Sequence, residues 1–187
     1  MKSSKFDHLE ELYAPYRTCT RLLVENGSKN IIFGEGSPDA KIMFIGEAPG
    51  ANEDKLGRPF VGRSGKLLNK ILESAGLKRE EVFITNIVKV RPPNNRKPYP
   101  QELQRGRDLL FHQIDIIKPK VICTLGASAL EGLLDKKVAM KQMRGTPFTL
   151  HGTTIFPTFH PAFILRNPKE LETLVADIFR ACELAQE

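Results

Sequence analysis

The chain has 187 residues, of which 41% are hydrophobic and 27% are charged. This length and composition fit one globular domain over residues 1–187 and exclude a disordered polyelectrolyte or a fibrous repeat. No apolar run reaches the roughly 18 residues of a membrane helix, and the first residues lack the apolar stretch of a secretory signal, so we expect a cytoplasmic protein. The net charge of +6 is compatible with nucleic acid as a partner, although many proteins that bind none are equally basic.

The first half of the chain predicts two strands with a helix between them. Lys41–Gly46 and Val82–Val88 are nearly continuous apolar runs, which is typical of parallel strands buried on both faces. Between these runs, Ser64 is predicted to cap a helix that ends at Gly76. The apolar stripe of this helix comprises Leu67, Leu68, Ile71, Leu72 and Ala75.

The second half continues the alternation of helices and strands. A helix is predicted from about Pro100 to Ile117, followed by a third buried strand at Lys120–Gly126. A fourth apolar run covers Thr153–His160, and Pro157 within it predicts a sheet edge or a kink.

The last helix is predicted from Pro168 to about Ala185, with Asn167 as its N-cap and Pro168 in its first turn. The whole pattern predicts an α/β fold with three layers, α/β/α, around a central, mostly parallel four-stranded sheet. In such sheets, ligands bind beyond the carboxyl ends of the strands. We therefore expect the functional site in the segments that follow the four strands.

Two common phosphate-binding motifs are excluded. Residues 46–50 (GEAPG) are too short for a P-loop, and no Gly-Lys-Ser/Thr follows at the required spacing. Residues 34–36 (GEG) precede the first strand, whereas a dinucleotide-binding fingerprint follows one.

Four residues of different chemistry lie in or after these strands: Glu47, Phe60, Asn86 and His160. Each alone has an ordinary explanation, as a loop acid, a core ring, a turn amide and a structural histidine. Together they are the groups needed to hold and excise a nucleobase. The ring can stack on the base, and the amide offers a donor and an acceptor to the base edge. The histidine can donate to an oxygen that becomes negative, while the carboxylate stabilises a cationic sugar and orients water.

Four motifs carry these residues: FGEGSPDAKIMFIGEAPG, GRPFVGRSGKLLNKIL, ITNIVKVRPP and HPAFILRNP. In sequence, order and spacing they resemble the family 4 uracil-DNA glycosylases, with similarity from about Cys19 to Pro168. The resemblance implies a parallel sheet flanked by helices, and hydrolysis of the N-glycosidic bond of uracil flipped out of DNA.

The resemblance also implies a role for each site residue. Glu47 and His160 would be catalytic, with Glu47 placing or activating water near the sugar C1′ and His160 stabilising the anion at uracil O2. Phe60 would stack on the extruded uracil, and Asn86 would read the pyrimidine edge and reject cytosine. Glu53 would crowd C5 and exclude the methyl group of thymine.

Further contacts follow from the same resemblance and from the basic loops. Backbone groups at Ala48 are expected to contact the substrate, and the segment Ala162–Arg166 is similar to a loop that enters the duplex and fills the gap left by the flipped base. Arg144 belongs to a basic loop that would face either phosphate or solvent. The residues expected to contact DNA are Gly62, Arg63, Ser128, Arg144, Phe163 and Arg166.

The chain departs from the family at the cysteines that hold an iron–sulfur cluster. Of the four cluster positions only Cys19 is a cysteine, and Leu22, Val90 and Gly106 occupy the others. A cluster needs four thiolates, and the chain has only three cysteines in all. We therefore expect no cluster, no metal and no other cofactor.

The sequence thus predicts a monomeric, monofunctional glycosylase acting on uracil in single- or double-stranded DNA. No lysine stands at a recognised nucleophile position, so strand cleavage through a Schiff base is not expected. Two alternatives remain open at this point. One is a glycosylase for another deaminated base, such as hypoxanthine or xanthine, and the other is a non-catalytic DNA-binding protein of the same fold.

Overall fold

A six-stranded sheet forms the centre of the computed structural model, which describes residues 4–18 and 27–187. The strand order is β1-β3-β2-β4-β6-β5. Its four inner strands, β2 (Ile42–Gly46), β3 (Phe83–Asn86), β4 (Val121–Leu125) and β6 (Thr153–Thr158), are parallel to one another. These are the four predicted strands, and the predicted α/β class is confirmed.

Two short antiparallel strands make the sheet wider than the four strands predicted. β1 (Glu35–Gly36) pairs with β3 at one edge, and β5 (Phe148–Leu150) pairs with β6 at the other. Both are too short to give a periodic pattern in the sequence. Pro157 is tolerated in β6 because β5 pairs with β6 only as far as Ile155, so among the described strands only β4 pairs with Pro157.

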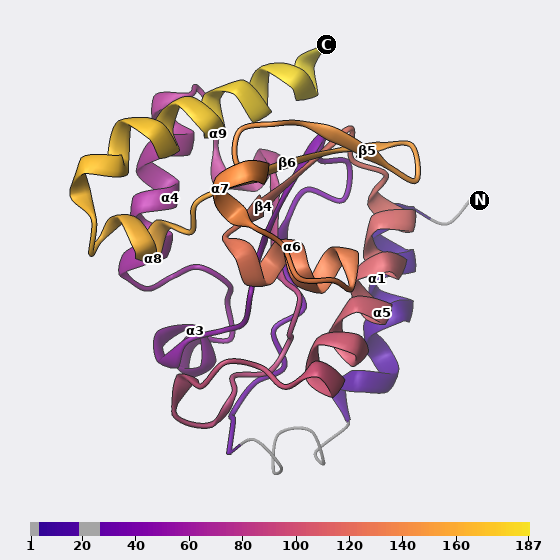
Figure 1. Cartoon of the computed structure of the whole chain (residues 1–187). Helices are drawn as coiled ribbons and strands as arrows, with labels where there is room; N and C mark the ends of the chain where they lie inside the picture. Colours follow the sequence, from indigo (N-terminus) through magenta and orange to yellow (C-terminus); the bar gives the residue numbers. More distant parts are fainter. Residues whose placement is uncertain (1–3, 19–26) are drawn as a thin grey trace.

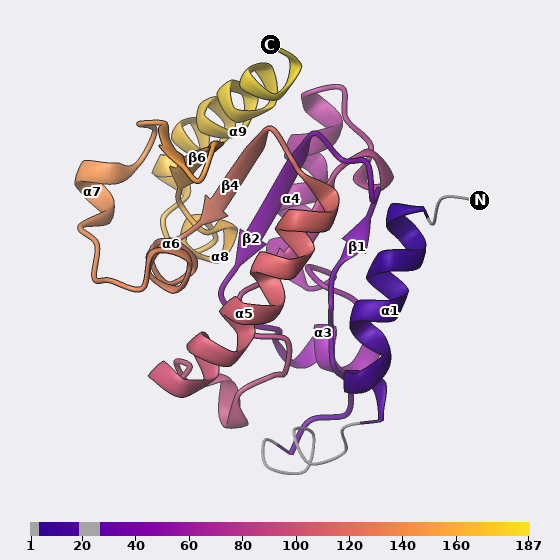
Figure 2. The same ribbon diagram turned by 90° about the vertical axis from the view of Figure 1, so that its right-hand side faces the viewer.

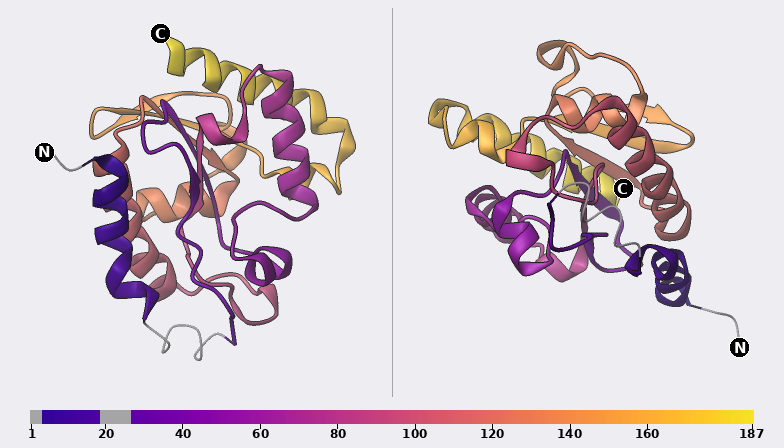
Figure 3. Two further views of the ribbon diagram at one scale, coloured as in Figure 1. Left: turned by 180° about the vertical axis from the view of Figure 1, so that it is seen from behind. Right: turned by 90° about the horizontal axis from the view of Figure 1, so that it is seen from below.

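Helices cover both faces of the sheet (Figure 1). One layer contains α4 (Arg63–Ser74) and α9 (Leu171–Gln186), which pack against Phe44 and Cys123. Figure 3 shows α1, in indigo, and α4, in magenta, on opposite sides of the sheet when the molecule is seen from behind.

The other layer contains α1 (Lys5–Arg17), α5 (Pro100–Ile117) and α6 (Ala127–Leu134), and Figure 2 shows α1 beside α5. These helices pack against Met43 and Ile122, the neighbours in sequence of Phe44 and Cys123. Successive strand residues therefore face opposite apolar layers, which explains the continuous apolar runs.

Two helix starts differ from the prediction. Helix α4 begins at Arg63, with Gly62 rather than Ser64 as its N-cap. Helix α9 begins at Leu171, after a 3₁₀ turn over Pro168–Glu170. Asn167 is at the N-cap position of this 3₁₀ turn, but its side-chain oxygen makes no capping bond, and its amide N–H donates to the carbonyl oxygen of Phe163 at 3.0 Å.

Three short helices complete the fold: α3 (Ala51–Leu56), α7 (Met140–Met143) and α8 (Pro161–Ile164). Helix α3 follows β2 and α8 follows β6, so both lie beyond the carboxyl ends of parallel strands. No helix in the two described ranges is long and apolar enough to cross a membrane.

Candidate active site

A pocket of about 170 Å³ lies beyond the carboxyl ends of the inner strands. It brings together side chains from the segments after β2, from α3, from the start of α4, and from the ends of β3 and β6. Its lining residues are Ala48, Gly50, Glu53, Phe60, Ser64, Asn86 and His160. Sequence reasoning named five of these but missed Gly50 and Ser64, both of which stand inside the quoted motifs.

Asn86 is the last residue of β3 and is only 2% exposed. A Cβ atom on Gly46 would lie 2.4 Å from Asn86 Oδ1 and 2.6 Å from the Phe60 ring, so the absent side chain of Gly46 makes room for both. No hydrogen bond joins the Asn86 amide to any residue in the described ranges. The side-chain amide lines the pocket and is open to it, so its donor and acceptor are available to a ligand, which makes Asn86 a candidate recognition group.

His160 follows β6 and caps α8 with its side chain. Nδ1 accepts a hydrogen bond from the Ala162 N–H at 3.0 Å, so the proton of the neutral ring is on Nε2. Burial lowers the pKa of His160 to about 4, opposed by the charge of Glu53 and reinforced by that of Arg166. At neutral pH the ring is therefore an uncharged hydrogen-bond donor.

Phe60 lies beside this histidine, with ring centroids 5.6 Å apart and planes inclined by 28°. Its backbone has a φ of 49°, an unusual value for a residue with a side chain. Arg79 holds this conformation by donating to the carbonyl oxygens of Phe60 and Pro59. The strained backbone thus fixes an aromatic face at the pocket.

Glu53, on α3, is 9% exposed and held in one orientation. Its Oε1 accepts hydrogen bonds from the Val61 N–H at 2.9 Å and the Gly62 N–H at 2.7 Å. These bonds tie α3 to the N-terminus of α4 and keep the carboxylate in the pocket wall.

Glu47, predicted as the catalytic carboxylate, is not one of the lining residues. It is half-buried and directly precedes Ala48, which does line the pocket. Its carbonyl oxygen accepts from the Val88 N–H at 3.0 Å, while its carboxylate has no hydrogen bond or ion pair within residues 4–18 and 27–187. The carboxylate is therefore free of protein partners in these ranges, but it is not part of the pocket lining.

Comparison with known proteins identifies the family. Residues 33–182 match the family model described as the uracil DNA glycosylase superfamily. The chain belongs to that superfamily. It is 47% identical over 164 residues to a type-4 uracil-DNA glycosylase of Thermotoga maritima, covering 86% of this chain and 85% of the relative.

Two archaeal relatives agree with this assignment. The chain is 43% identical over 188 residues to the type-4 uracil-DNA glycosylase of Sulfurisphaera tokodaii, covering 96% of this chain and 86% of that protein. It is 44% identical over 187 residues to the one from Saccharolobus solfataricus, covering 95% and 86%. The resemblance to family 4 seen in the motifs is confirmed.

The residues expected to contact DNA differ in how exposed they are. Arg63 and Arg166 are exposed, and Ser128 lies in the first turn of α6. Phe163 packs on Phe159, with ring centroids 4.9 Å apart, while Leu165 in the same loop is 45% exposed. The exposed apolar tip of this loop is thus Leu165, which sequence reasoning did not single out.

Arg144 already has a partner within the protein. Its guanidinium donates to both carboxylate oxygens of Asp177 at 2.8 Å, and Asp177 also accepts from the Thr158 hydroxyl at 2.6 Å. This ion pair ties the loop after α7 to α9 and to the end of β6. A structural role therefore accompanies the predicted contact of Arg144 with DNA.

The positions expected to hold a cluster in this family are occupied by residues that do not fit one. Val90 is buried, and a Cβ on Gly106 would lie 2.1 Å from the carbonyl oxygen of Ile87, so a cysteine at position 106 would collide with the backbone. The other two expected positions, 19 and 22, lie outside the described residues.

The two cysteines that the structure describes are poor ligands. Cys123 lies in β4 and Cys182 in α9, and both are buried. Burial raises the pKa of the Cys123 thiol, and it raises the pKa of Cys182 to about 11, which disfavours thiolates. In the described ranges no three His, Cys, Asp or Glu side chains gather where they could hold a metal ion.

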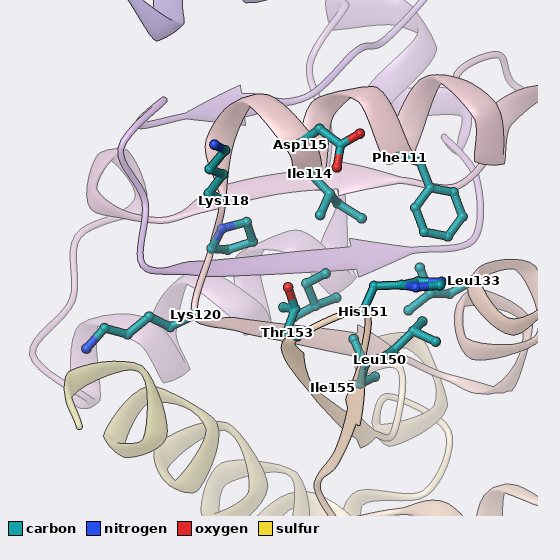
Figure 4. Close-up of a pocket in the computed structure, with 13 residues that line it drawn as sticks. Phe111, Ile114, Asp115, Lys118, Lys120, Leu133, Leu150, His151, Thr153 and Ile155 are labelled. Atoms are coloured by element: carbon teal, nitrogen blue, oxygen red, sulfur yellow. The ribbon is translucent and has the colours of Figure 1, made fainter.

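A larger pocket of about 430 Å³ lies elsewhere (Figure 4). The end of α5, the segment before β4 and the turn between β5 and β6 form it, with Phe111, Lys118 and His151 among its lining residues. It contains none of the predicted site residues, because it lies where β4 and β6 begin, at the opposite end of the strands.

Proposed function

We propose that this protein hydrolyses the N-glycosidic bond of uracil in DNA and releases the free base. The observation that carries the proposal is the buried Asn86 amide, which faces the pocket without a protein partner beside the neutral His160. An amide supplies the acceptor and the donor that match N3–H and O4 of uracil. The names of the type-4 relatives support uracil as the base.

The pocket supplies each part of the reaction. The extruded uracil stacks on Phe60, which contributes about 1–3 kcal/mol to binding. As the C1′–N1 bond breaks, negative charge grows on uracil O2, and His160 Nε2–H stabilises it as a hydrogen-bond donor. Because the ring is neutral at neutral pH with its proton on Nε2, it is present as this donor before and after the bond breaks.

The two carboxylates, Glu47 and Glu53, have different roles: one acts on the attacking water and the other selects the base. Glu47, with its carboxylate free of protein partners, orients water towards C1′ and stabilises the cationic sugar. Glu53, fixed by two backbone N–H groups, occupies the space where a 5-methyl group would enter.

We also propose that the enzyme works without an iron–sulfur cluster. Four thiolates are required, the chain has three cysteines, and position 106 has no room for a cysteine side chain. Purified protein should therefore contain no stoichiometric iron and be colourless. Iron at four atoms per chain, with a brown chromophore, would contradict this part of the proposal.

The activity is tested with labelled single- and double-stranded DNA carrying one uracil, followed by alkali to cut abasic sites. Matched strands carrying cytosine, thymine, hypoxanthine or xanthine define the substrate range. Uracil-dependent cleavage that is much slower, though still measurable, in Asn86→Ala, with an unchanged unfolding temperature, supports the proposal. Cleavage only at hypoxanthine or xanthine, or tight DNA binding without cleavage at any base, would refute it.

A further inference from the structure

Lys89 is a buried lysine that the reaction described above does not use. It lies three residues after Asn86 and is only 5% exposed. Its amino group donates hydrogen bonds of 2.7 Å to Thr85 Oγ1, to the Asn86 carbonyl oxygen and to Gln113 Oε1. A charged group without an ionised partner is rarely buried, so this arrangement needs an explanation.

The three acceptors match the three N–H bonds of an ammonium group. Thr85 uses its own proton to donate to the Phe33 carbonyl oxygen at 2.7 Å. Gln113 uses its amide N–H groups on Tyr13 and on Phe33, at 2.6 Å and 2.8 Å, so Oε1 is free to accept. Burial lowers the pKa of Lys89, whereas this closed set of acceptors favours the protonated form.

One of these bonds fixes the peptide group that carries Asn86. The Asn86 carbonyl accepts from Lys89, and the N–H of the same peptide, on Ile87, donates to the Gly46 carbonyl at 2.9 Å. Both polar atoms of the peptide are therefore held. The Asn86 side chain has no hydrogen bond of its own within the described residues, so its direction depends on this backbone.

We propose that Lys89 is a positioning residue for uracil recognition: by holding the Asn86 peptide to α5 through Gln113, it fixes the direction in which the Asn86 amide faces the pocket. This inference rests on the proposed function. Lys89 touches neither base nor phosphate, and it acts only through Asn86.

A double-mutant cycle tests the proposal. Excision of uracil is measured in single turnover with saturating enzyme, for the wild type, Lys89→Met, Asn86→Ala and the double variant. We expect Lys89→Met to slow excision on the order of tenfold, within the coupling range of residues in one hydrogen-bond network. In the Asn86→Ala background the same substitution should have no further effect, because the group it positions is gone.

A purely structural role gives a different result. Lys89→Met would then slow Asn86→Ala by the same factor as the wild type, and this additivity would overturn the proposal, as would a wild-type rate in Lys89→Met. Thr85→Val is the matched control, since it removes a neighbouring acceptor of the same ammonium but keeps the bond to Asn86. Its excision rate should stay within about twofold of the wild type.

Two precautions keep the outcome decisive. All rates are taken well below the unfolding temperature of each variant, and Lys89→Leu, which also removes every donor, replaces Lys89→Met in the cycle if the latter does not fold. A wild-type protein that fails to excise uracil refutes the proposed function itself. An active wild type with an additive cycle refutes only the role of Lys89.

Discussion

His160 should make the folded protein less stable in mild acid, by an amount that follows from its environment. Its ordinary pKa is 6.5, and burial lowers the pKa in the folded state to about 4. The unfolded chain therefore binds more protons between these values, so stability is complete above pH 6.5 and falls as the pH drops towards 4. The loss from pH 7.5 to pH 4 is about 3 kcal/mol, an upper value because the ring keeps some contact with solvent through the pocket.

His160→Asn isolates this contribution from the carboxylates that also titrate in acid. Asparagine is a favourable N-cap and can still accept the Ala162 N–H, so α8 keeps its first turn. The free energy of unfolding is measured with urea for both proteins between pH 4 and 7.5. The wild type should lose about 3 kcal/mol relative to His160→Asn over this range. A constant difference would show that His160 is not held neutral and would remove the basis for its role as an uncharged donor.

Three further predictions concern other parts of the molecule. Gly106→Ala should lower the free energy of unfolding in urea by about 1–3 kcal/mol, because the new Cβ would meet the Ile87 carbonyl. On an exposed helix the same substitution raises the free energy of unfolding, so a stabilised variant would contradict the close packing. Glu53→Ala should permit excision of thymine from a G·T mismatch, whereas Glu53→Gln, of similar size, should not; equal behaviour of the two variants would exclude steric selection. Leu165→Ala should slow excision from duplex DNA more than from single strands, because only a duplex leaves a stacked gap to fill; equal losses on both would argue against insertion of this loop.

The sequence predicts the frame of the fold because its signals are local. The four inner strands are buried on both faces, so their apolar runs are continuous, and the stripes of α4, α5 and α9 repeat at helical spacing. The edge strands β1 and β5 give no such signal, since a strand of two or three residues depends on its neighbour for its hydrogen bonds. Asn167 caps by position alone, since it precedes the 3₁₀ turn that leads into α9 but its side-chain oxygen makes no capping bond.

Most residues that line the pocket could be predicted from the sequence, but the residues that hold them in place through long-range contacts could not. Six of the seven lining residues stand in motifs quoted from the sequence, whereas the ion pair of Arg144 with Asp177 joins residues 33 positions apart and leaves no local pattern. The same holds for Lys89, which follows β3 and whose partner Gln113 lies 24 positions later, on α5. Contacts between residues far apart in the sequence leave no local pattern, so only the folded structure shows them.

In the cluster-free enzyme that we propose, contacts within the protein would hold the segment after Asn86. The N–H groups of Ile87 and Val88 bond to the carbonyls of Gly46 and Glu47, so the backbone stays parallel to the exit of β2 beyond the end of β3. On the opposite side, Gly106 lets α5 approach this segment closely. A helix at this separation braces the segment by contact, in the place where the resemblance implies that relatives use metal and thiolates. A cysteine at position 106 would meet the Ile87 carbonyl and force α5 away from this segment, so the close packing of α5 is consistent with the cluster-free enzyme that we propose.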